Sequence, residues 1–265
     1  MVSRKKNERP HEPASSGTLI NNQLYFKRKR GNCKEMKKFE LTSEFITNIS
    51  GTKLFRIKAL VEFGNIKAGE LGGYIEKEEN LDQDGDAWVY GDAEVWGNAK
   101  VYGDAWVYGD AWVYGNAKVC GDAWVSGNAE VYGDAEVYGN AKVCGDAWVS
   151  GNAKVYGDAW VSGNAKVCGD AKVCDDAWVY GNAEVCGNAK VCDDADYAYA
   201  HGFGSVYRTT TFFRLKDGGV GVRCGCFYGT LQEFRDKVRA THKETKKAKE
   251  YLMLADLMEL RFSEE

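Results

Sequence analysis

GDAWVYGDAEVWGNAKVY, residues 85–102, states three times the six-residue pattern that decides the fold of this chain. The pattern is Gly, Asp or Asn, Ala, a variable residue, Val and a second variable residue. It continues without an insertion to Cys192, giving eighteen hexads over residues 85–192. Ala and Val keep their slots throughout, and the Gly slot departs only at Asp175. A short period sustained this long predicts a solenoid, in which each unit buries its apolar face only against its neighbours.

The order of residues within each hexad predicts which side chains face the core. Ala and Val are two positions apart, so in a strand they point to the same side, while the residue between them points away. Gly followed by Asp or Asn is a bend signal, because Gly permits positive φ and the Asx side chain bonds to nearby backbone. We therefore expect short strands separated by bends, with Ala and Val inward and both variable positions outward.

This pattern resembles the hexapeptide repeat of left-handed parallel β-helix proteins, the trimeric transferase-like superfamily. The segment Lys67–Glu78, KAGELGGYIEKE, which leads into the repeats, is similar to a bacterial and prophage group labelled as transferases. The resemblance implies an all-β solenoid with left-handed, three-sided coils of eighteen residues. Six such coils, spaced about 4.8 Å apart, would be about 29 Å long. It also implies a homotrimer.

Outside the repeats, composition divides the chain into three further parts. Residues 1–39 are basic, with Arg4-Lys5-Lys6 and 27–30, and we expect a disordered extension rather than a nucleic-acid site. Met36 is a candidate true start. Residues 40–84 are expected to cap the N-terminal end of the β-helix, which is assigned to 85–196, with Ile75 and Leu81 in phase with its Ala slots. Residues 197–265 are expected to form an α+β cap: a hairpin over 205–227, a helix opened by the capping box Thr230–Glu233, and a second helix over 246–262.

Charge and cysteine usage narrow the class of protein. With 35 Lys and Arg against 39 Asp and Glu, the chain is mildly acidic. No apolar run is long enough to span a membrane and no signal-peptide core follows the N-terminus, so we expect a cytoplasmic protein without membrane contact. Six of the nine cysteines occupy outward slots that elsewhere hold Tyr or Ser, which favours free thiols. The pairs Cys168/Cys186 and Cys174/Cys192, one coil apart, could be bridged only if oxidised. We predict no metal site and no cofactor.

Histidine usage argues against an enzyme. The resemblance implies that acyl-transferring relatives use a coil-borne His as general base, and that carbonic anhydrases of this fold use three metal-binding His. The only histidines here are His11, His201 and His242, and none lies in the hexads. An acyltransferase with His201 as its base, just after the last coil, is therefore the alternative hypothesis, because a base must titrate near neutrality and reach the acceptor. Fold likeness alone is a poor warrant for chemistry.

Residues eighteen apart should stack in columns, so the outward positions form three walls. One wall is aromatic, with Tyr beside Trp, and approaches about 400 Å², the size of a large apolar patch rich in residues that anchor interfaces. Its members are Trp88, Trp106, Trp124, Trp160, Trp178, Tyr90, Tyr108 and Tyr180, interrupted by Lys142. We expect it to bind a protein partner or a second copy of the chain. The alternative is that the stacked rings only brace neighbouring strands.

The third wall is basic: Lys100, Lys118, Lys154, Lys172 and Lys190. Basic and aromatic positions together suit single-stranded nucleic acid. The repeats as a whole carry 15 acidic side chains against 7 Lys, so we do not expect nucleic-acid binding. Part of the wall pattern also reflects duplication, since Gly115–Ala129 and Gly139–Ala153 are identical at an offset of four hexads. The sequence therefore favours a non-catalytic, protein-binding β-helix of bacterial or prophage origin.

Overall fold

The computed structural model of the chain describes residues 36–204 and 208–263. Residues 1–35, most of the expected disordered extension, lie outside the described part. The candidate start at Met36 is the first described residue. Lys37 to Phe39, which the sequence assigned to that extension, belong to the fold. Lys37 Nζ lies 2.6 Å from Glu78 Oε1, Lys38 is buried, and Phe39 begins the first strand.

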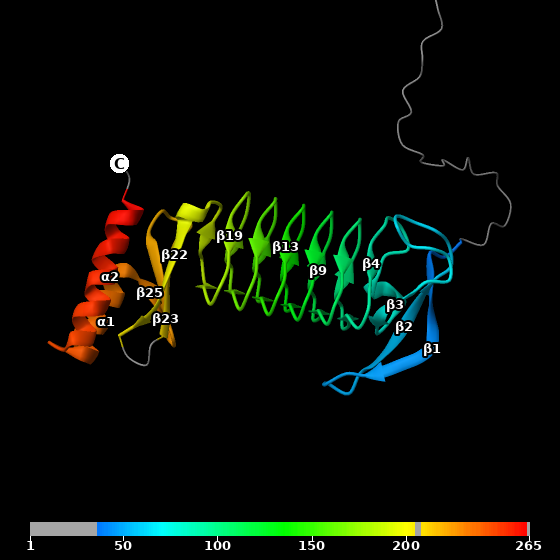
Figure 1. The fold of residues 1–265 in the computed structure, drawn as a ribbon, viewed down its shortest axis with the longest axis horizontal. Helices are drawn as coiled ribbons and strands as arrows, with labels where there is room; N and C mark the ends of the chain where they lie inside the picture. Colours follow the sequence, from blue (N-terminus) through cyan, green and yellow to red (C-terminus); the bar gives the residue numbers. More distant parts are fainter. Residues whose placement is uncertain (1–35, 205–207, 264–265) are drawn as a thin grey trace, which may run out of the picture. The chain divides into compact units, whose positions relative to one another are not determined.

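The hexads form a parallel β-solenoid of about seven turns in which strands pair with those eighteen residues away (Figure 1). Each hexad contributes one two-residue strand, and successive strands take up three faces in turn. The first face holds β4 (Trp88–Val89), β7 (Trp106–Val107), β10 (Trp124–Val125), β13 (Lys142–Val143), β16 (Trp160–Val161) and β19 (Trp178–Val179). The second holds β5 (Glu94–Val95), β8 (Trp112–Val113), β11 (Glu130–Val131), β14 (Trp148–Val149), β17 (Lys166–Val167) and β20 (Glu184–Val185). The third holds β6 (Lys100–Val101), β9 (Lys118–Val119), β12 (Glu136–Val137), β15 (Lys154–Val155), β18 (Lys172–Val173) and β21 (Lys190–Val191).

The inward and outward slots are as predicted. Every Ala and Val of the repeat is buried in one continuous core. Backbone hydrogen bonds join each coil to the next, as from Trp106 N to Ala123 O at 2.9 Å and from Tyr108 N to Val125 O at 3.0 Å. The bends leave no room for a side chain. Gly139 has φ +73°, and a Cβ there would lie 3.0 Å from Gly157 N, so Gly is required on steric grounds as well as conformational ones.

Residues before the hexads close the N-terminal end of the core. The strands β1 (Phe39–Thr47), β2 (Lys53–Ala59) and β3 (Leu71–Ile75) form an antiparallel extension of the second face, and a 3₁₀ turn, η1, spans Glu78–Asn80. Because β3 pairs in parallel with β5, this segment adds a turn to the six built from hexads. The cap therefore continues the solenoid rather than only covering it.

The register of this added turn differs from the predicted one. Ile75 pairs with Val95 and Leu81 bridges to Val101, so both residues fill Val positions and not Ala positions. The reason is local chain length: Leu81 to Val89 is eight positions, against six between successive Val residues of the repeat. The larger side chains thereby join the Val columns, where Ile75 and Leu81 are buried.

The C-terminal end carries an α+β module with its own core. The strands β22 (Tyr197–Phe203), β23 (Arg208–Arg214), β24 (Val220–Cys224) and β25 (Phe227–Thr230) form an antiparallel sheet, preceded by the 3₁₀ turn η2 (Asp194–Asp196). The helices α1 (Leu231–His242) and α2 (Lys246–Phe262) pack against it. The expected hairpin is confirmed for β23 and β24, and the Thr230–Glu233 capping box is confirmed at α1. The strands β22 and β25 were not expected from the sequence pattern. Within residues 36–204 and 208–263, neither α1 nor α2 combines the length and the apolar composition that a membrane span requires.

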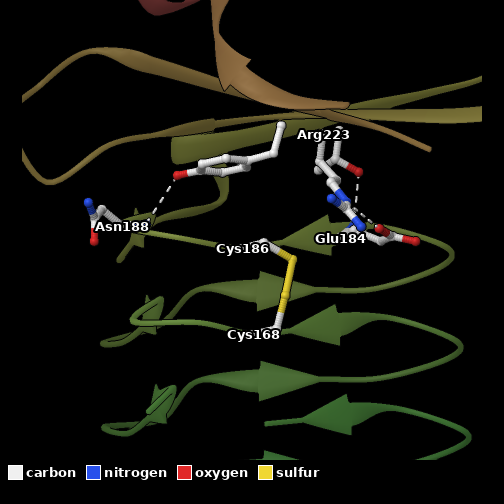
Figure 2. Close-up of a disulfide and its surroundings, with 7 residues drawn as sticks. Cys168, Glu184, Cys186, Asn188 and Arg223 are labelled. Atoms are coloured by element: carbon white, nitrogen blue, oxygen red, sulfur yellow. Dashed lines mark hydrogen bonds and ion pairs between the residues drawn. A yellow bond between two sulfur atoms is a disulfide. The ribbon is translucent and has the colours of Figure 1, made fainter. Parts of the chain in front are cut away.

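Polar contacts attach this module to the last coils (Figure 2). Arg223 Nε lies 2.9 Å from Glu184 Oε2, and Tyr228 Oη accepts a hydrogen bond from Asn188 N at 3.3 Å. Phe213 of β23 is buried in the core of the solenoid itself. The module thus covers apolar surface and strand edges that the end of a solenoid would otherwise expose.

The prediction of free thiols is wrong for four of the cysteines. Disulfides join Cys168 to Cys186 and Cys174 to Cys192, with Cα atoms 4.6 Å and 4.4 Å apart. Each pair is separated by eighteen residues, so parallel pairing of adjacent coils holds the two side chains side by side (Figure 2). Cys120, Cys144, Cys224 and Cys226 are free.

Candidate binding face

The tryptophans of the first face form an ordered, partly exposed column. Trp124 and Trp160 are each 38% exposed and Trp178 is 44% exposed. Trp106 stacks on Trp124 with ring centroids 5.6 Å apart and an interplanar angle of 3°, and Trp160 stacks on Trp178 at 5.1 Å and 12°. The stacking follows directly from the eighteen-residue coil, which places identical side chains opposite each other on adjacent strands.

Lys142 joins the two Trp pairs into one column. Its Nζ lies 5.2 Å from the ring centroid of Trp124 and 5.5 Å from that of Trp160. Both distances are within the range of a cation–π interaction, so the ammonium group occupies the place where a ring would otherwise stack. The residue that interrupts the Trp pattern in the sequence is part of the same ladder in the structure.

Hydrogen bonds at the neighbouring corner fix the orientation of the rings. Trp160 Nε1 donates to Cys144 Sγ at 3.0 Å, and Trp178 Nε1 donates to Ser162 Oγ at 3.2 Å. With the indole nitrogens bound at the edge of the face, the outward surfaces of these rings remain apolar. The repeat pattern alone does not reveal this role of the small polar residues that follow Val.

The predicted tyrosines flank the column. Tyr90 contacts Trp106 at 5.6 Å, Tyr108 contacts Trp124 edge-on at 6.3 Å, and Tyr180 lies 5.4 Å from Trp178. Tyr180 is 46% exposed, and the other two are half-buried. Burial raises the pKa of Tyr90, with a smaller contribution from Glu70.

Trp88 does not share the exposure of this column. It is fully buried, with Phe63 5.3 Å and Phe39 6.2 Å away between ring centroids. The N-terminal cap covers it, so Trp88 is part of the core at that end. We define the Trp face as the rest of the column, from the half-buried Trp106 through the exposed Trp124, Lys142 and Trp160 to Trp178.

A row of carboxylates borders the Trp face. The Asx slot before each Trp places exposed Asp side chains along one corner, interrupted by Asn140, which donates from Nδ2 to Asp158 Oδ1 at 2.7 Å. The row consists of Asp86, Asp104, Asp122, Asn140, Asp158 and Asp176. The apolar rings therefore have a negative margin, which favours cationic groups near the face.

The predicted basic wall is partly neutralised. Glu136 lies between Lys118 and Lys154 on the third face, with its carboxylate oxygens 3.3 Å and 2.6 Å from their ammonium groups. The hydrogen bond from Lys154, followed by that from Lys118, lowers the pKa of the Glu136 carboxyl. Lys172 and Lys190 pair directly with each other in the strand register. Lys100 is exposed near the N-terminal cap, where it lines a groove of about 660 Å³ with Glu79 and Asp82.

The second face carries a smaller aromatic group. Trp148 is 38% exposed, and Lys166 Nζ lies 4.7 Å from its ring centroid. Trp112 is half-buried and packs edge-on against Trp96 at 5.8 Å. Glu130 lies between Trp112 and Trp148, so no continuous Trp column forms on this face. The second face can therefore serve as a control for the Trp column of the first face.

His201 has no enclosed surroundings. It lies exposed on β22, and its Nδ1 is 3.0 Å from Thr209 Oγ1 on the adjacent strand. The five grooves described over residues 36–204 and 208–263 do not have His201 in their lining. The contact described for His201 is thus that of a hydrogen-bonded ring at an exposed sheet surface.

The fold places the chain in the class of parallel β-solenoids with end caps. No family model matches it, and no curated protein proved similar in sequence. What this chain does must therefore be argued from its own surfaces.

Proposed function

We propose that this chain is a non-catalytic binding scaffold whose Trp face contacts a protein partner. The observation that carries the proposal is a column of partly exposed indole rings that stack in two nearly parallel pairs, with two of the indole nitrogens hydrogen-bonded at the corner. Trp is strongly enriched among residues that dominate interface energies. Rings already fixed in the free protein lose little conformational freedom when they bind. An aromatic column used only as internal bracing would not need to leave Trp124, Trp160 and Trp178 more than a third exposed.

The chemistry of the partner is suggested by Lys142. Its ammonium group sits between two indole rings of the face, and carboxylates border the same column. A partner that presents Lys or Arg side chains could repeat this arrangement on the outer surfaces of the rings, with the Asp row supplying the opposite charge. We therefore infer a protein partner with a basic surface segment. A second copy of this acidic chain is the less favoured occupant.

The finer classification rests on the resemblance of the repeat. We infer a hexapeptide-repeat protein of the left-handed β-helix group, of bacterial or prophage origin and cytoplasmic. The uninterrupted Gly-Asx-Ala-x-Val-x pattern and the Lys67–Glu78 segment support this assignment. An acyltransferase using His201 is not favoured by any contact that residue makes.

The proposal is tested with two matched double variants. Trp124→Ser with Trp160→Ser alters the Trp face, and Trp112→Ser with Trp148→Ser removes two tryptophans from the second face. Each lost stacking pair should cost about 0.2–1 kcal/mol of stability, which circular dichroism and thermal melting would verify. Binding is measured on an array of basic peptides, each paired with a version in which Lys and Arg are replaced by Gln.

We expect the wild type and the second-face variant to bind the same basic peptides, and the Trp-face variant to bind at least about tenfold more weakly, as for loss of an interface hot spot. The Gln versions should not bind. Equal binding by both variants would overturn the proposal. Light scattering addresses the other occupant: a trimer or dimer lost only in the Trp-face variant would replace the basic partner with a second copy of the chain.

A further inference from the structure

The third face ends in a cluster of sulfur and carboxylate groups. The tetrapeptide Val-Cys-Asp-Asp occurs at 173–176 and again at 191–194, one coil later. The Sγ atoms of Cys174 and Cys192 and a carboxylate oxygen of Asp175 all lie within 4.8 Å of one another. Cys174 is buried, Cys192 is half-buried and Asp175 is exposed, so the cluster opens to solvent on one side.

Asp175 has the left-handed backbone conformation that Gly has at the same position of the other hexads. Its φ is +55°, and among the hexads it alone replaces Gly at the bend. A left-handed backbone costs a non-Gly residue roughly 1–2 kcal/mol, although Asp tolerates it better than most. The repeat offers a strain-free alternative at this position, so the carboxylate is retained at a cost.

The Asp175 carboxylate makes no hydrogen bond or ion pair with any other residue in the part of the chain that is described. The acidic groups one coil later, by contrast, accept hydrogen bonds from the backbone. Asp193 Oδ1 accepts a hydrogen bond from Ala195 N, and Asp194 Oδ1 accepts one from Trp178 N, both at 2.8 Å. Asp175 is therefore the acidic group of this cluster that remains available to a ligand.

We propose that Cys174, Asp175 and Cys192 form a binding site for a thiophilic divalent cation such as Zn²⁺ when the Cys174–Cys192 disulfide is reduced. Two thiolates and one carboxylate are ligands that Zn²⁺ accepts, and water can fill the fourth tetrahedral position on the exposed side. With Zn–S distances of about 2.3 Å, tetrahedral ligand atoms lie roughly 3.8 Å apart. The three ligand atoms lie within 4.8 Å of one another, which is close to this spacing.

The two states of the site exclude each other chemically. Reducing the disulfide takes two electrons and two protons, which a dithiol supplies while it becomes a disulfide. With a phosphine, the phosphine supplies the electrons and is oxidised to the phosphine oxide, while water supplies its oxygen and the protons. Binding of the cation then forms two metal–sulfur bonds and releases the two thiol protons to solvent. The oxidised form has no thiolate to offer.

The second cysteine pair provides an internal control. Cys168 and Cys186 are also one coil apart and also disulfide-bonded, but Gly169 and Gly187 follow them where Asp175 and Asp193 follow the others. The two pairs share the eighteen-residue spacing and nearly the same Cα separation, 4.6 Å and 4.4 Å, and only the Cys174/Cys192 pair has a carboxylate beside it. We therefore expect the cation to bind at the Cys174/Cys192 pair and not at the Cys168/Cys186 pair.

The test uses the full chain reduced with a water-soluble phosphine under nitrogen and titrated with Co²⁺, whose absorption reports thiolate ligation and tetrahedral geometry. Cys168→Ser with Cys186→Ser keeps the proposed site and removes the control pair. Cys174→Ser with Cys192→Ser does the reverse. Asp175→Gly, made in the first of these backgrounds, restores the repeat's own residue, so its melting temperature should equal or exceed that of its parent.

We expect one Co²⁺ per chain, displaced by Zn²⁺, in the wild type and in the variant that keeps Cys174 and Cys192. Binding should be absent in the variant that lacks them. It should be at least about tenfold weaker after Asp175→Gly, because removing a group that only supports a ligand already costs that much, and Asp175 is a ligand. No uptake by the reduced wild type would overturn the proposal. So would equal uptake at the Cys168/Cys186 pair, or unchanged affinity in Asp175→Gly.

Discussion

Lys38 is the residue that most directly joins the N-terminal cap to the solenoid. Its buried Nζ donates to the carbonyl oxygens of Ala87 at 3.0 Å, Gly85 at 3.2 Å and Asp84 at 3.3 Å. The ring of Phe63 lies 4.9 Å from the same nitrogen. These carbonyls lie in the first hexad and on the residue just before it, where no earlier hexad is present, so the lysine satisfies acceptors at the end of the repeat.

Burial lowers the pKa of Lys38 to about 8, against the opposing effect of nearby Asp82 and Asp86. In the unfolded chain the pKa is about 10.4. Between these values the unfolded state binds a proton that the native state has released, so the Lys38 contribution to the free energy of unfolding rises with pH. It is complete above the unfolded pKa and is lost as the pH falls through about 8.

We expect this pH dependence to disappear in Lys38→Met. The free energies of unfolding of the two proteins, measured in urea, should diverge in favour of the wild type from pH about 8 to about 10.4. Their difference should be constant below that window. A constant difference throughout would mean that the ammonium group keeps its proton in the fold.

At the same scale, Trp88 shows why single residues of the site were only partly predictable. The eighteen-residue spacing alone places Trp88 in the Trp column, correctly. Its exposure depends on Phe39 and Phe63, which lie far away in sequence and approach through the antiparallel cap. The joining of Cys174 to Cys192 was likewise a question of oxidation that spacing cannot answer.

Among the elements, the corners of the coil contain side-chain ladders as regular as the strands. Asn116, Asn128 and Asn152 each donate from Nδ2 to the Asp eighteen residues later, at 2.9, 2.8 and 2.8 Å. An Asn within an Asp column supplies the donor that a carboxylate lacks and separates like charges. Asp and Asn alternate irregularly at the position after Gly. This mixture therefore stabilises the corners of the coil.

Asn140→Asp tests this account. The change removes the donor to Asp158 and makes the corner before the Trp face an uninterrupted row of six carboxylates. We expect the free energy of unfolding to fall by about 1 kcal/mol, from repulsion and a lost hydrogen bond. High salt should restore part of the loss.

The same substitution at Asn98 is the control. Asn98 is followed in its column by Asn116, and Lys77 Nζ lies 3.4 Å from its Oδ1. Asn98→Asp also loses a hydrogen bond, from Asn98 Nδ2 to Asn116 Oδ1 at 3.2 Å, but its new carboxylate faces an ammonium group and an amide, so it should cost less stability than Asn140→Asp. If both variants lost the same stability, the ladder would have no role in charge separation.

The elements themselves were predictable to the extent that the repeat is regular. The alternation of buried Ala and Val with outward residues follows from strand geometry, and the structure confirms it from Ala87 to Val191. The register was predicted wrongly before Val89, where two extra residues interrupt the six-residue period. Strands were missed after the last hexad, where the period ends. β22 has Ala, His and Gly among its aromatic residues, and β25 is only four residues long. Both gain their partners from β23 and β24, not from a local pattern.

At the level of the whole molecule, the three-sided coil makes the Trp face sensitive to the number of hexads. Deleting residues 127–132, one hexad, keeps every Val opposite a Val and shifts all later residues by one face. Trp124 would then pair with Trp148, followed by Lys166 and Glu184 in place of Trp160 and Trp178. Deleting residues 127–144, three hexads, would keep the faces aligned and place Trp160 directly against Trp124.

We expect both deletion variants to fold cooperatively, because solenoid stability is nearly a sum of unit and neighbour terms. The shorter deletion should lose binding to basic peptides and the longer one should keep it, as measured on the array described above. If both retained binding, the partner would recognise something other than the column. This comparison separates the Trp face from its individual rings.

The direction of the backbone hydrogen bonds has a mechanical consequence. They run from coil to coil along the stacking axis, as from Asp104 N to Gly121 O and from Trp106 N to Ala123 O. A tensile load applied along that axis would strain the bonds of one coil at a time, so the chain would unwind in steps at modest force. The covalent links Cys168–Cys186 and Cys174–Cys192 would resist this in the last coils while they stay oxidised. Under tension, the coils before Cys168 would therefore unfold first and release their chain. The last coils would stay folded, with the C-terminal module still attached to them.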